Sequence, residues 1–193
     1  MYQTLLSDST LYRLLFRIDQ QLAAEAKARG CWCGGRLHSA RYPRKPRGIP
    51  ADVEDDYEYR FSFCCAEEGC RQRTTPPSFR FLGRKVFVSA VVVLVTVLRH
   101  GPTPTRTAKL HELVGVSART IFRWRFWWQD TFTRTPFWKA ARGLLQVPID
   151  ESSLPLSLLE SFPVNHPKSR LHRLLRFISP LSTTWRGTRK SEG

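Results

Sequence analysis

The residues best suited to chemistry are five cysteines, all confined to one stretch between positions 31 and 70. They form two groups, Cys31-Trp-Cys33-Gly-Gly35 and Cys64-Cys65-Ala-Glu-Glu-Gly-Cys70. Two such groups can bring four thiolates to the corners of a tetrahedron, which is the coordination of structural Zn²⁺, and the glycines let backbone N–H groups turn toward sulfur. We therefore expect a structural zinc site made by Cys31, Cys33, Cys65 and Cys70. Because four thiolates leave no open position for water, a catalytic zinc is not expected.

The spacing leaves alternatives open for the ligand set. Cys64 can replace Cys65, and His38 is a weaker substitute. The first pair, Cys-x-Cys, is tighter than the Cys-x2-Cys of most structural zinc sites, so a second interpretation is a group of reduced thiols in a small core. A disulfide framework is disfavoured in a reducing compartment. A nucleophilic cysteine with His38 or His100 as base is also disfavoured, since nothing in the sequence places either histidine beside a thiol.

A second informative stretch runs from Leu110 to Trp124 and has the pattern of two helices joined by a short turn. Gly115 permits the tight turn, Val116 fills the core beneath it, and Ser117 caps the second helix. With that cap, Ile121, Trp124 and Trp128 recur at helical spacing and are expected to face the first helix. The pattern is typical of a helix-turn-helix unit.

The outward face of the second helix is the expected contact with DNA. Its first half would approach base edges and phosphates, and basic residues further along the chain would neutralise phosphate. Fourteen basic residues stand against Glu112 and Asp130 over positions 71–149, a local net charge of +12. The alternatives are an ordinary solvated face, or an aromatic cluster at 122–128 that stacks on single-stranded bases. The residues expected to touch DNA are Ser117, Ala118, Arg119, Thr120, Arg123, Arg125, Arg134 and Lys139.

The elements that position these groups indicate an α+β, mostly α fold: a small β-rich zinc ribbon followed by a helix-turn-helix helical bundle. Apolar periodicity predicts an amphipathic helix from Ser9 to Arg29, capped by Asp8 or Ser9 and ended by Gly30. The length of the apolar run Val86 to His100 favours a helix, Thr105 is expected to cap the next one, and Thr135-Pro136 to open another. The expected division is an N-terminal helix (1–30), a zinc-ribbon-like module (31–82), a helix-turn-helix DNA-binding domain (83–147), and short helices with a basic, flexible tail (148–193).

Composition narrows the class of protein. The chain has 193 residues, 41% of them hydrophobic, with a formal net charge of +15, so it should fold and should bind a polyanion. A secretory signal is not evident, and the longest apolar run is shorter than the roughly 18 residues of a membrane span. We expect a cytoplasmic, nucleoid-associated protein that makes no contact with membranes.

The motifs as a set resemble the zinc-ribbon and helix-turn-helix head of bacterial insertion-sequence transposases, and small accessory proteins carried beside them. The resemblance lies in Cys-x-Cys-Gly-Gly, in Cys-Cys-x4-Cys followed by Arg71-x-Arg-Thr-Thr-Pro-Pro77, and in Leu-x-Glu-Leu-Val-Gly-Val-Ser-x-Arg-Thr-Ile-x-Arg-Trp. It covers residues 30–128 and implies binding to the DNA at transposon ends. Such transposases cut DNA with an RNase-H-like core that has three carboxylates and two metal ions. Only Asp150, Glu151, Glu160 and Glu192 follow Arg142, so no catalytic triad can be assigned.

The sequence therefore favours a DNA-binding protein that is not an enzyme on its own. Its expected partners are double-stranded DNA, a catalytic transposase subunit and a second copy of itself. One competing function is a protein-docking scaffold built on the zinc ribbon. The other is an active nuclease or recombinase that uses some of Asp52, Asp55, Asp56, Glu58, Asp150 and Glu151.

Overall fold

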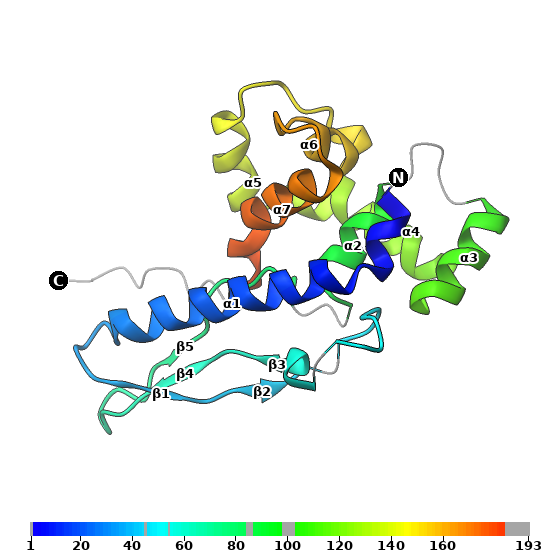
Figure 1. Cartoon of the computed structure of the whole chain (residues 1–193). Helices are drawn as coiled ribbons and strands as arrows, with labels where there is room; N and C mark the ends of the chain where they lie inside the picture. Colours follow the sequence, from blue (N-terminus) through cyan, green and yellow to red (C-terminus); the bar gives the residue numbers. More distant parts are fainter. Residues whose placement is uncertain (1, 45, 54, 84–86, 98–102, 184–193) are drawn as a thin grey trace.

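The computed structural model describes residues 2–44, 46–53, 55–83, 87–97 and 103–183. One long helix and two small antiparallel sheets form one half of the molecule, and short helices form the other half (Figure 1). The α+β, mostly α class is therefore confirmed. The two ends of the predicted helix 86–100 lie outside the described residues, as do His100, Arg84, Lys85, Arg99, Glu192 and the rest of the tail from position 184.

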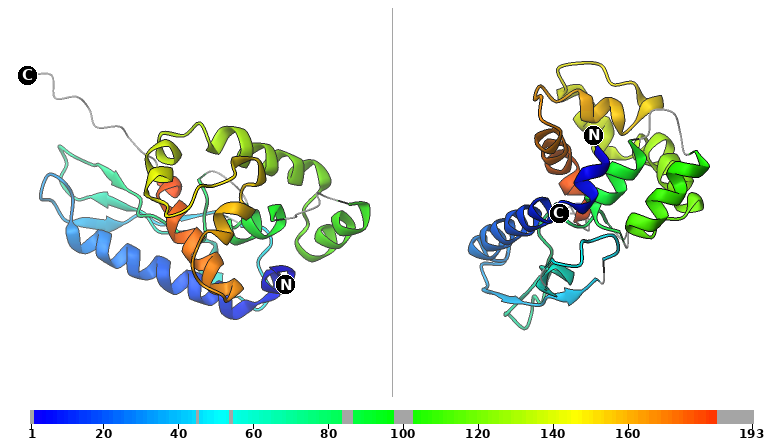
Figure 2. Two further views of the ribbon diagram at one scale, coloured as in Figure 1. Left: turned by 90° about the horizontal axis from the view of Figure 1, so that it is seen from above. Right: turned by 45° about the vertical axis from the view of Figure 1, so that its right-hand side comes forward.

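Helix α1 (Ser9–Arg29) has the bounds that the periodicity predicts. The Asp8 side chain caps it by accepting hydrogen bonds from the backbone of Thr10 and Leu11, and Gly30 ends it. A short 3-10 helix, Tyr2–Ser7, precedes the cap. The helix buries one face, including Leu11 and Leu15, and it lies along the small sheets in both figures (Figures 1 and 2).

The strands between the two cysteine groups are short. β1 (Leu37–Ser39), β4 (Phe63–Cys65) and β5 (Arg73–Thr74) make one sheet in the order β1-β4-β5, while β2 (Tyr42–Pro43) pairs with β3 (Tyr59–Arg60). A 3-10 helix, Asp55–Glu58, leads into β3. A small core between α1 and the three-stranded sheet contains Ala23, Ala26, Cys31, Leu37, Phe63 and Cys65. The first cysteine group thus follows α1 directly, and the second begins on β4, the strand that pairs with β1, and ends in the turn after it.

A buried ion pair connects α1 to the chain that follows β5. The Nε of Arg80 lies 2.9 Å from Oδ2 of Asp19, and both side chains are 0% exposed. The Arg80 guanidinium also donates to the carbonyls of Tyr57 and Tyr59 and lies over four aromatic rings. Arg80 was expected to belong to the basic surface of residues 71–149; that expectation is wrong, because a paired guanidinium in the interior contributes to packing and leaves no charge for a polyanion.

The helical half begins with α2 (Ser89–Thr96), which is buried all round, as its continuous apolar sequence predicts. Helix α3 (Pro104–Val114) is capped by Thr103, so the prediction of Thr105 as cap is wrong; Pro104 takes the first helical position, where its missing N–H costs nothing. After α3 come α4 (Ala118–Phe126), a π-helical segment Trp127–Phe132, and α5 (Pro136–Ala141), capped by Thr135 and continued by a 3-10 turn, Arg142–Leu144.

The last described elements are α6 (Leu156–Glu160) and α7 (Pro167–Ile178), flanked by 3-10 turns at Glu151–Ser153 and Ser179–Ser182. Helix α7 buries Leu171, Leu174, Leu175 and Ile178. The main core draws on residues from Leu5 to Ile178, so side chains from all four expected segments pack together. No helix within the described ranges is both long and apolar enough to cross a membrane.

Candidate metal centre and candidate DNA surface

Four of the five cysteines meet at one point. The Sγ atoms of Cys31, Cys33, Cys65 and Cys70 all lie within 4.8 Å of one another. The separations are 3.7 Å for the sulfurs of Cys31 and Cys70 and 3.5 Å for those of Cys33 and Cys65. A tetrahedron of thiolates around Zn²⁺, with bonds of about 2.3 Å, has sulfurs about 3.8 Å apart. The cluster can therefore hold a metal ion, and it is the ligand set expected from the sequence.

The first cysteine pair is held by a tight turn after α1. The backbone N–H of Cys31 donates to the carbonyl of Gly35 at 3.0 Å, and that of Gly34 donates to the carbonyl of Cys31 at 2.9 Å. Gly34 has φ +83°, a conformation that side chains disfavour. Gly35 is needed for a different reason: a Cβ there would lie 2.8 Å from the Sγ of Cys65. The backbone at Gly35 therefore forms part of the wall around the sulfurs.

The second group is held by the turn between β4 and β5. The N–H of Cys65 donates to the carbonyl of Gln72 at 3.0 Å, and the N–H of Cys70 donates to that of Glu67 at 3.0 Å. Arg71 completes the turn with φ 44°, the left-handed region. The result is that Cys65, on the strand, and Cys70, in the turn, present their sulfurs to the first pair.

Strand alternation decides between Cys64 and Cys65. Neighbouring residues of a strand point to opposite faces, and Cys65 is buried opposite Leu37 while Cys64 lies opposite the exposed His38. The Sγ of Cys64 contacts the carbonyl of Arg71 at 3.6 Å and takes no part in the cluster. His38 on β1 and Cys64 on β4 therefore lie on the face of the sheet away from the cluster, and neither alternative ligand is brought to it.

Four thiolates in this cluster would carry negative charges that a bound cation can balance. A backbone hydrogen bond from Gly35 lowers the pKa of Cys33 to about 7, whereas burial raises the pKa of Cys65 to about 12. Four thiolates this close would repel one another, so all four can lose their protons only when a positive ion lies between them. With all four positions taken by sulfur, an ion held there would have no open position for water.

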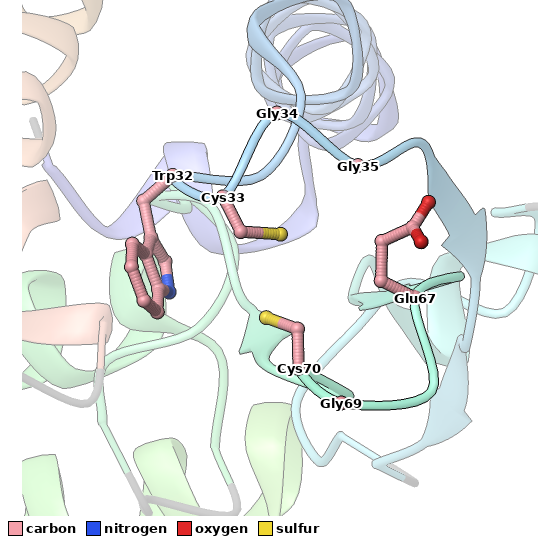
Figure 3. A pocket seen from close by; sticks show the side chains of 7 residues that line it. All are labelled: Trp32, Cys33, Gly34, Gly35, Glu67, Gly69 and Cys70. Carbon is pink, nitrogen blue, oxygen red and sulfur yellow. The ribbon is translucent and has the colours of Figure 1, made fainter.

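One side of the cluster opens into a shallow hollow (Figure 3). Trp32, Cys33, Gly34, Gly35, Glu67, Gly69 and Cys70 line it, and the sulfurs of Cys33 and Cys70 point toward each other across it. The Trp32 side chain is 84% exposed at the rim. Glu67 lies on the far side, with its carboxylate beside Gly35 in the figure.

Helices α3 and α4 are joined as the sequence predicts. Gly115 takes the left-handed conformation, with φ 67° and ψ 23°, and its N–H donates to the carbonyl of His111 at 2.8 Å. The Ser117 side chain accepts a hydrogen bond from the N–H of Thr120 at 3.4 Å. Val116 and Ile121 are fully buried, and Trp124 packs edge-on against Phe87 with ring centroids 5.0 Å apart. The turn and the Ser117 cap lie where the sequence predicts them, and the buried side of α4 packs against Phe87 and α2. The expected packing of Ile121, Trp124 and Trp128 on the first helix stays a prediction.

The expected DNA contacts divide into two sets. Ser117, Ala118, Arg119 and Arg123 are exposed and Thr120 is half-buried, all in or just before α4. Arg125 is half-buried on the same helix. Arg134 pairs with Asp130 at 2.6 Å. Lys139 is exposed on α5, which lies at the far end of the helical half from α3 in both figures, so the structure does not gather it with the first set (Figures 1 and 2).

Two exposed phenylalanines share the outer face of α4. Phe122 and Phe126 are 60% and 63% exposed, and with Arg119 and Arg123 they form one stripe at helical spacing. The aromatic run 122–128 therefore divides into two parts: Trp124 and Trp128 belong to the core, whereas Phe122 and Phe126 lie on the surface. Helical spacing alone distinguishes the surface rings from the core rings, because Phe122 and Phe126 lie three residues after Arg119 and Arg123, respectively, and so share their face of α4.

Three of the carboxylates considered for nuclease chemistry, Asp52, Asp150 and Glu151, have local structural partners. Asp52 pairs with Arg13 and accepts from Ser9, and Asp150 caps the 3-10 turn that follows it. Glu151 accepts a hydrogen bond from Nε1 of Trp138 at 2.7 Å and pairs with Arg142. Among the described residues, the cysteines form the only group of three or more metal-ligating side chains.

Comparison of the chain with protein-family models, with curated proteins and with solved structures found no match. The resemblance to transposase heads therefore rests on the motifs quoted from the sequence.

Proposed function

We propose that this chain binds double-stranded DNA through α4, is held in shape at its other end by a structural zinc ion, and has no cleavage activity of its own. The observation that carries the proposal is the turn at Gly115 and Ser117, which holds a capped helix with Arg119 and Arg123 exposed one turn apart. Within the described part of the chain, neither arginine has a carboxylate partner. Both charges are therefore available to a polyanion.

The shape of this region suits a major groove. A second helix that begins just after a tight turn can enter the groove by its N-terminal half, where the helix dipole also favours phosphate. An arginine fork can bond O6 and N7 of one guanine together. The apolar rings of Phe122 and Phe126 lie on the same stripe, and phenylalanine can contact the methyl group of thymine.

Zinc is the metal best suited to the cysteine cluster. A set of four thiolates at tetrahedral separations favours Zn²⁺ over hard cations such as Mg²⁺, which prefer oxygen ligands. In this proposal the ion fixes the small sheets against α1. It adds stability and no chemistry.

The target and the partners follow from the motif resemblance. We propose that the DNA is the end of a transposable element and that a separate transposase subunit supplies the carboxylates for cleavage. A second copy of this chain would let two DNA ends be held together. A nucleoid-associated location accords with the net charge of +15.

The test compares two single variants on two duplexes. Arg123→Ala should weaken binding to the cognate site by about 1–3 kcal/mol and should reduce the difference in affinity between the cognate and the scrambled duplex. Lys139→Ala removes a positive charge away from α4, so it should weaken binding to both duplexes equally and by less than Arg123→Ala, and it should reduce the slope of log affinity against log salt by at most about one. Competition binding over a salt series, with a selected site and its scrambled version, measures both quantities.

Two results would contradict the proposal. If Arg123→Ala and Lys139→Ala have the same effect on both duplexes, α4 does not read sequence. If the isolated chain cleaves DNA in the presence of Mg²⁺ and Asp150→Ala abolishes the cleavage, the chain is a nuclease.

A further inference from the structure

A second basic surface lies on α7, on a different element from the proposed DNA helix. A hollow of about 420 Å³ is lined by Phe162, His172, Arg173, Arg176 and Phe177. Its volume falls within the range of roughly 300–1,000 Å³ that small-molecule sites occupy. The lining contains no carboxylate, so the hollow combines positive charge with aromatic surface.

The helix places these side chains together by its spacing. His172 and Arg176 are four residues apart, as are Arg173 and Phe177, so the four form two adjoining rows on one face of α7. The opposite face of α7 is core. Phe162, from the segment after α6, completes the hollow with its ring 6.3 Å from that of Phe177.

The aromatic part of the hollow is rigid. Phe177 packs edge-on against Phe137 at 5.3 Å, and the His172 ring lies 5.4 Å from that of Phe79. These contacts restrict the movement of both rings. The surfaces that face the hollow are therefore fixed before any ligand arrives, which lowers the entropy that binding would cost.

The charged part is open. Arg173 and Arg176 are exposed, and no ion pair joins either to a carboxylate in the ranges that the structure describes. The pKa of His172 is lowered first by burial and then by the positive charges of Arg176 and Arg173. Both guanidinium groups therefore lie near enough to the His172 ring to disfavour its protonated form.

We propose that this hollow binds a nucleotide unit, with the phosphate on Arg173 and Arg176 and the base against Phe162 and Phe177. Two guanidinium groups one turn apart can hold a phosphate through several charge-assisted hydrogen bonds. Aromatic faces can stack on any of the four bases, because every base has a π-face. The ligand is a free nucleotide or the phosphorylated end of a DNA strand, and the two share this chemistry.

Calorimetric titration of the full chain with dAMP, with adenosine and with inorganic phosphate tests the inference. Saturable binding of dAMP is expected, with adenosine and inorganic phosphate each at least tenfold weaker, because each lacks one half of the recognised unit. The double variant Arg173→Gln/Arg176→Gln should lower dAMP affinity at least tenfold. Its thermal unfolding should be unchanged, since both side chains are exposed.

The matched control is Arg119→Gln/Arg123→Gln, which removes the same charge from α4. It should leave dAMP affinity within twofold while it weakens duplex binding, so this inference and the proposed function fail separately. Equal loss of dAMP affinity in the two double variants would show general attraction to positive charge and overturn the site. Absence of saturable dAMP binding, or tighter binding of an acidic, phenylalanine-containing peptide than of dAMP, would overturn it as well.

A pair of oligonucleotides separates the two sources of the ligand. If the site takes a strand end, 5′-phosphorylated (dA)5 binds more tightly than dAMP and than the same oligonucleotide without the phosphate. If it takes a free nucleotide, dAMP binds at least as tightly as either oligonucleotide. Both outcomes require Arg173 and Arg176 and support the nucleotide site.

Discussion

Replacing Gly35 with alanine adds one methyl group beside the cysteine sulfurs and tests whether they bind a metal ion in the arrangement that the structure shows. A Cβ at this position would lie 2.8 Å from the Sγ of Cys65 and 3.4 Å from that of Cys33. A free thiol can rotate away from the new methyl group, but a sulfur bound to a metal ion is fixed by its bond. The third neighbour, Cγ of Glu67 at 2.5 Å, belongs to an exposed, flexible side chain that can swing aside. The new methyl group therefore destabilises the metal-bound state more than the metal-free state.

The magnitude follows from the cost of overfilling a packed site. An extra methyl group in such a site costs about 1–3 kcal/mol. Because about 1.4 kcal/mol corresponds to a factor of ten, the Kd for Zn²⁺ should rise about 5- to 150-fold. The wild-type chain should bind one Zn²⁺, and competition with a chromophoric chelator measures both the stoichiometry and the affinity.

The control is Gly69→Ala. Gly69 lines the same hollow, but a Cβ there would meet no atom within 4 Å, so its Zn²⁺ affinity should stay within twofold of the wild type. If the two alanine variants bind Zn²⁺ with equal affinity, the sulfurs are not held where the structure places them. Tight zinc binding by Gly35→Ala would lead to the same conclusion.

Two further predictions concern stability. Asp19→Asn removes the charge that balances the fully buried Arg80, so the free energy of unfolding, measured in urea, should fall by about 3–5 kcal/mol. The control Arg13→Ala breaks an exposed pair with Asp52 and should cost at most about 1 kcal/mol. A loss below about 1 kcal/mol for Asp19→Asn would contradict the burial of the Asp19–Arg80 pair. Burial alone would raise the pKa of Asp8. Hydrogen bonds from Thr10, Lys168 and the backbone of Leu11 outweigh burial and lower this pKa from 3.8 to about 2. Because the pKa of Asp8 is lower in the folded state, its carboxylate stabilises the fold fully above about pH 4, and this stabilisation is lost as the pH falls through 2. The Tm values of the wild type and of Asp8→Asn should therefore differ above about pH 4 and converge near pH 2. A Tm difference that persists at about pH 2 would rule out the Asp8 carboxylate as its source.

Local signals in the sequence were enough to predict much of the fold and most of the cysteine site. The bounds of α1, the turn at Gly115 and the caps at Ser117 and Thr135 depend on residues within one or two helical turns, and the sequence shows them directly. Cys65 could be preferred over Cys64 from spacing, but the register of β4 against β1 is what separates their faces.

Features that depend on distant partners could not be predicted. Arg80 was assigned to the surface because arginine is rarely buried unless it is paired, and its partner Asp19 is on α1, 61 residues earlier. The hollow on α7 is completed by Phe162, which enters through the packing of α6 on α7 and has no sequence motif. In both cases the function of a charged residue depends on which distant side chain contacts it.

The contacts between the two ends of the described chain have a consequence for the order of folding. Nζ of Lys168 lies 2.9 Å from the carboxylate of Asp8, 160 residues earlier, and the buried Arg60 donates to the carbonyl of Ser182 at 3.4 Å. These long-range contacts can form only after α7 has left the ribosome, although α1 is made first. The face of α1 that packs on the small sheets can be covered once residues 37–80 have been made, whereas the contacts of Asp8 and Arg60 with the C-terminal segment form only at the end of synthesis. Fragments that contain only the cysteine-bearing half therefore lose both of these contacts unless they also include residues 167–182.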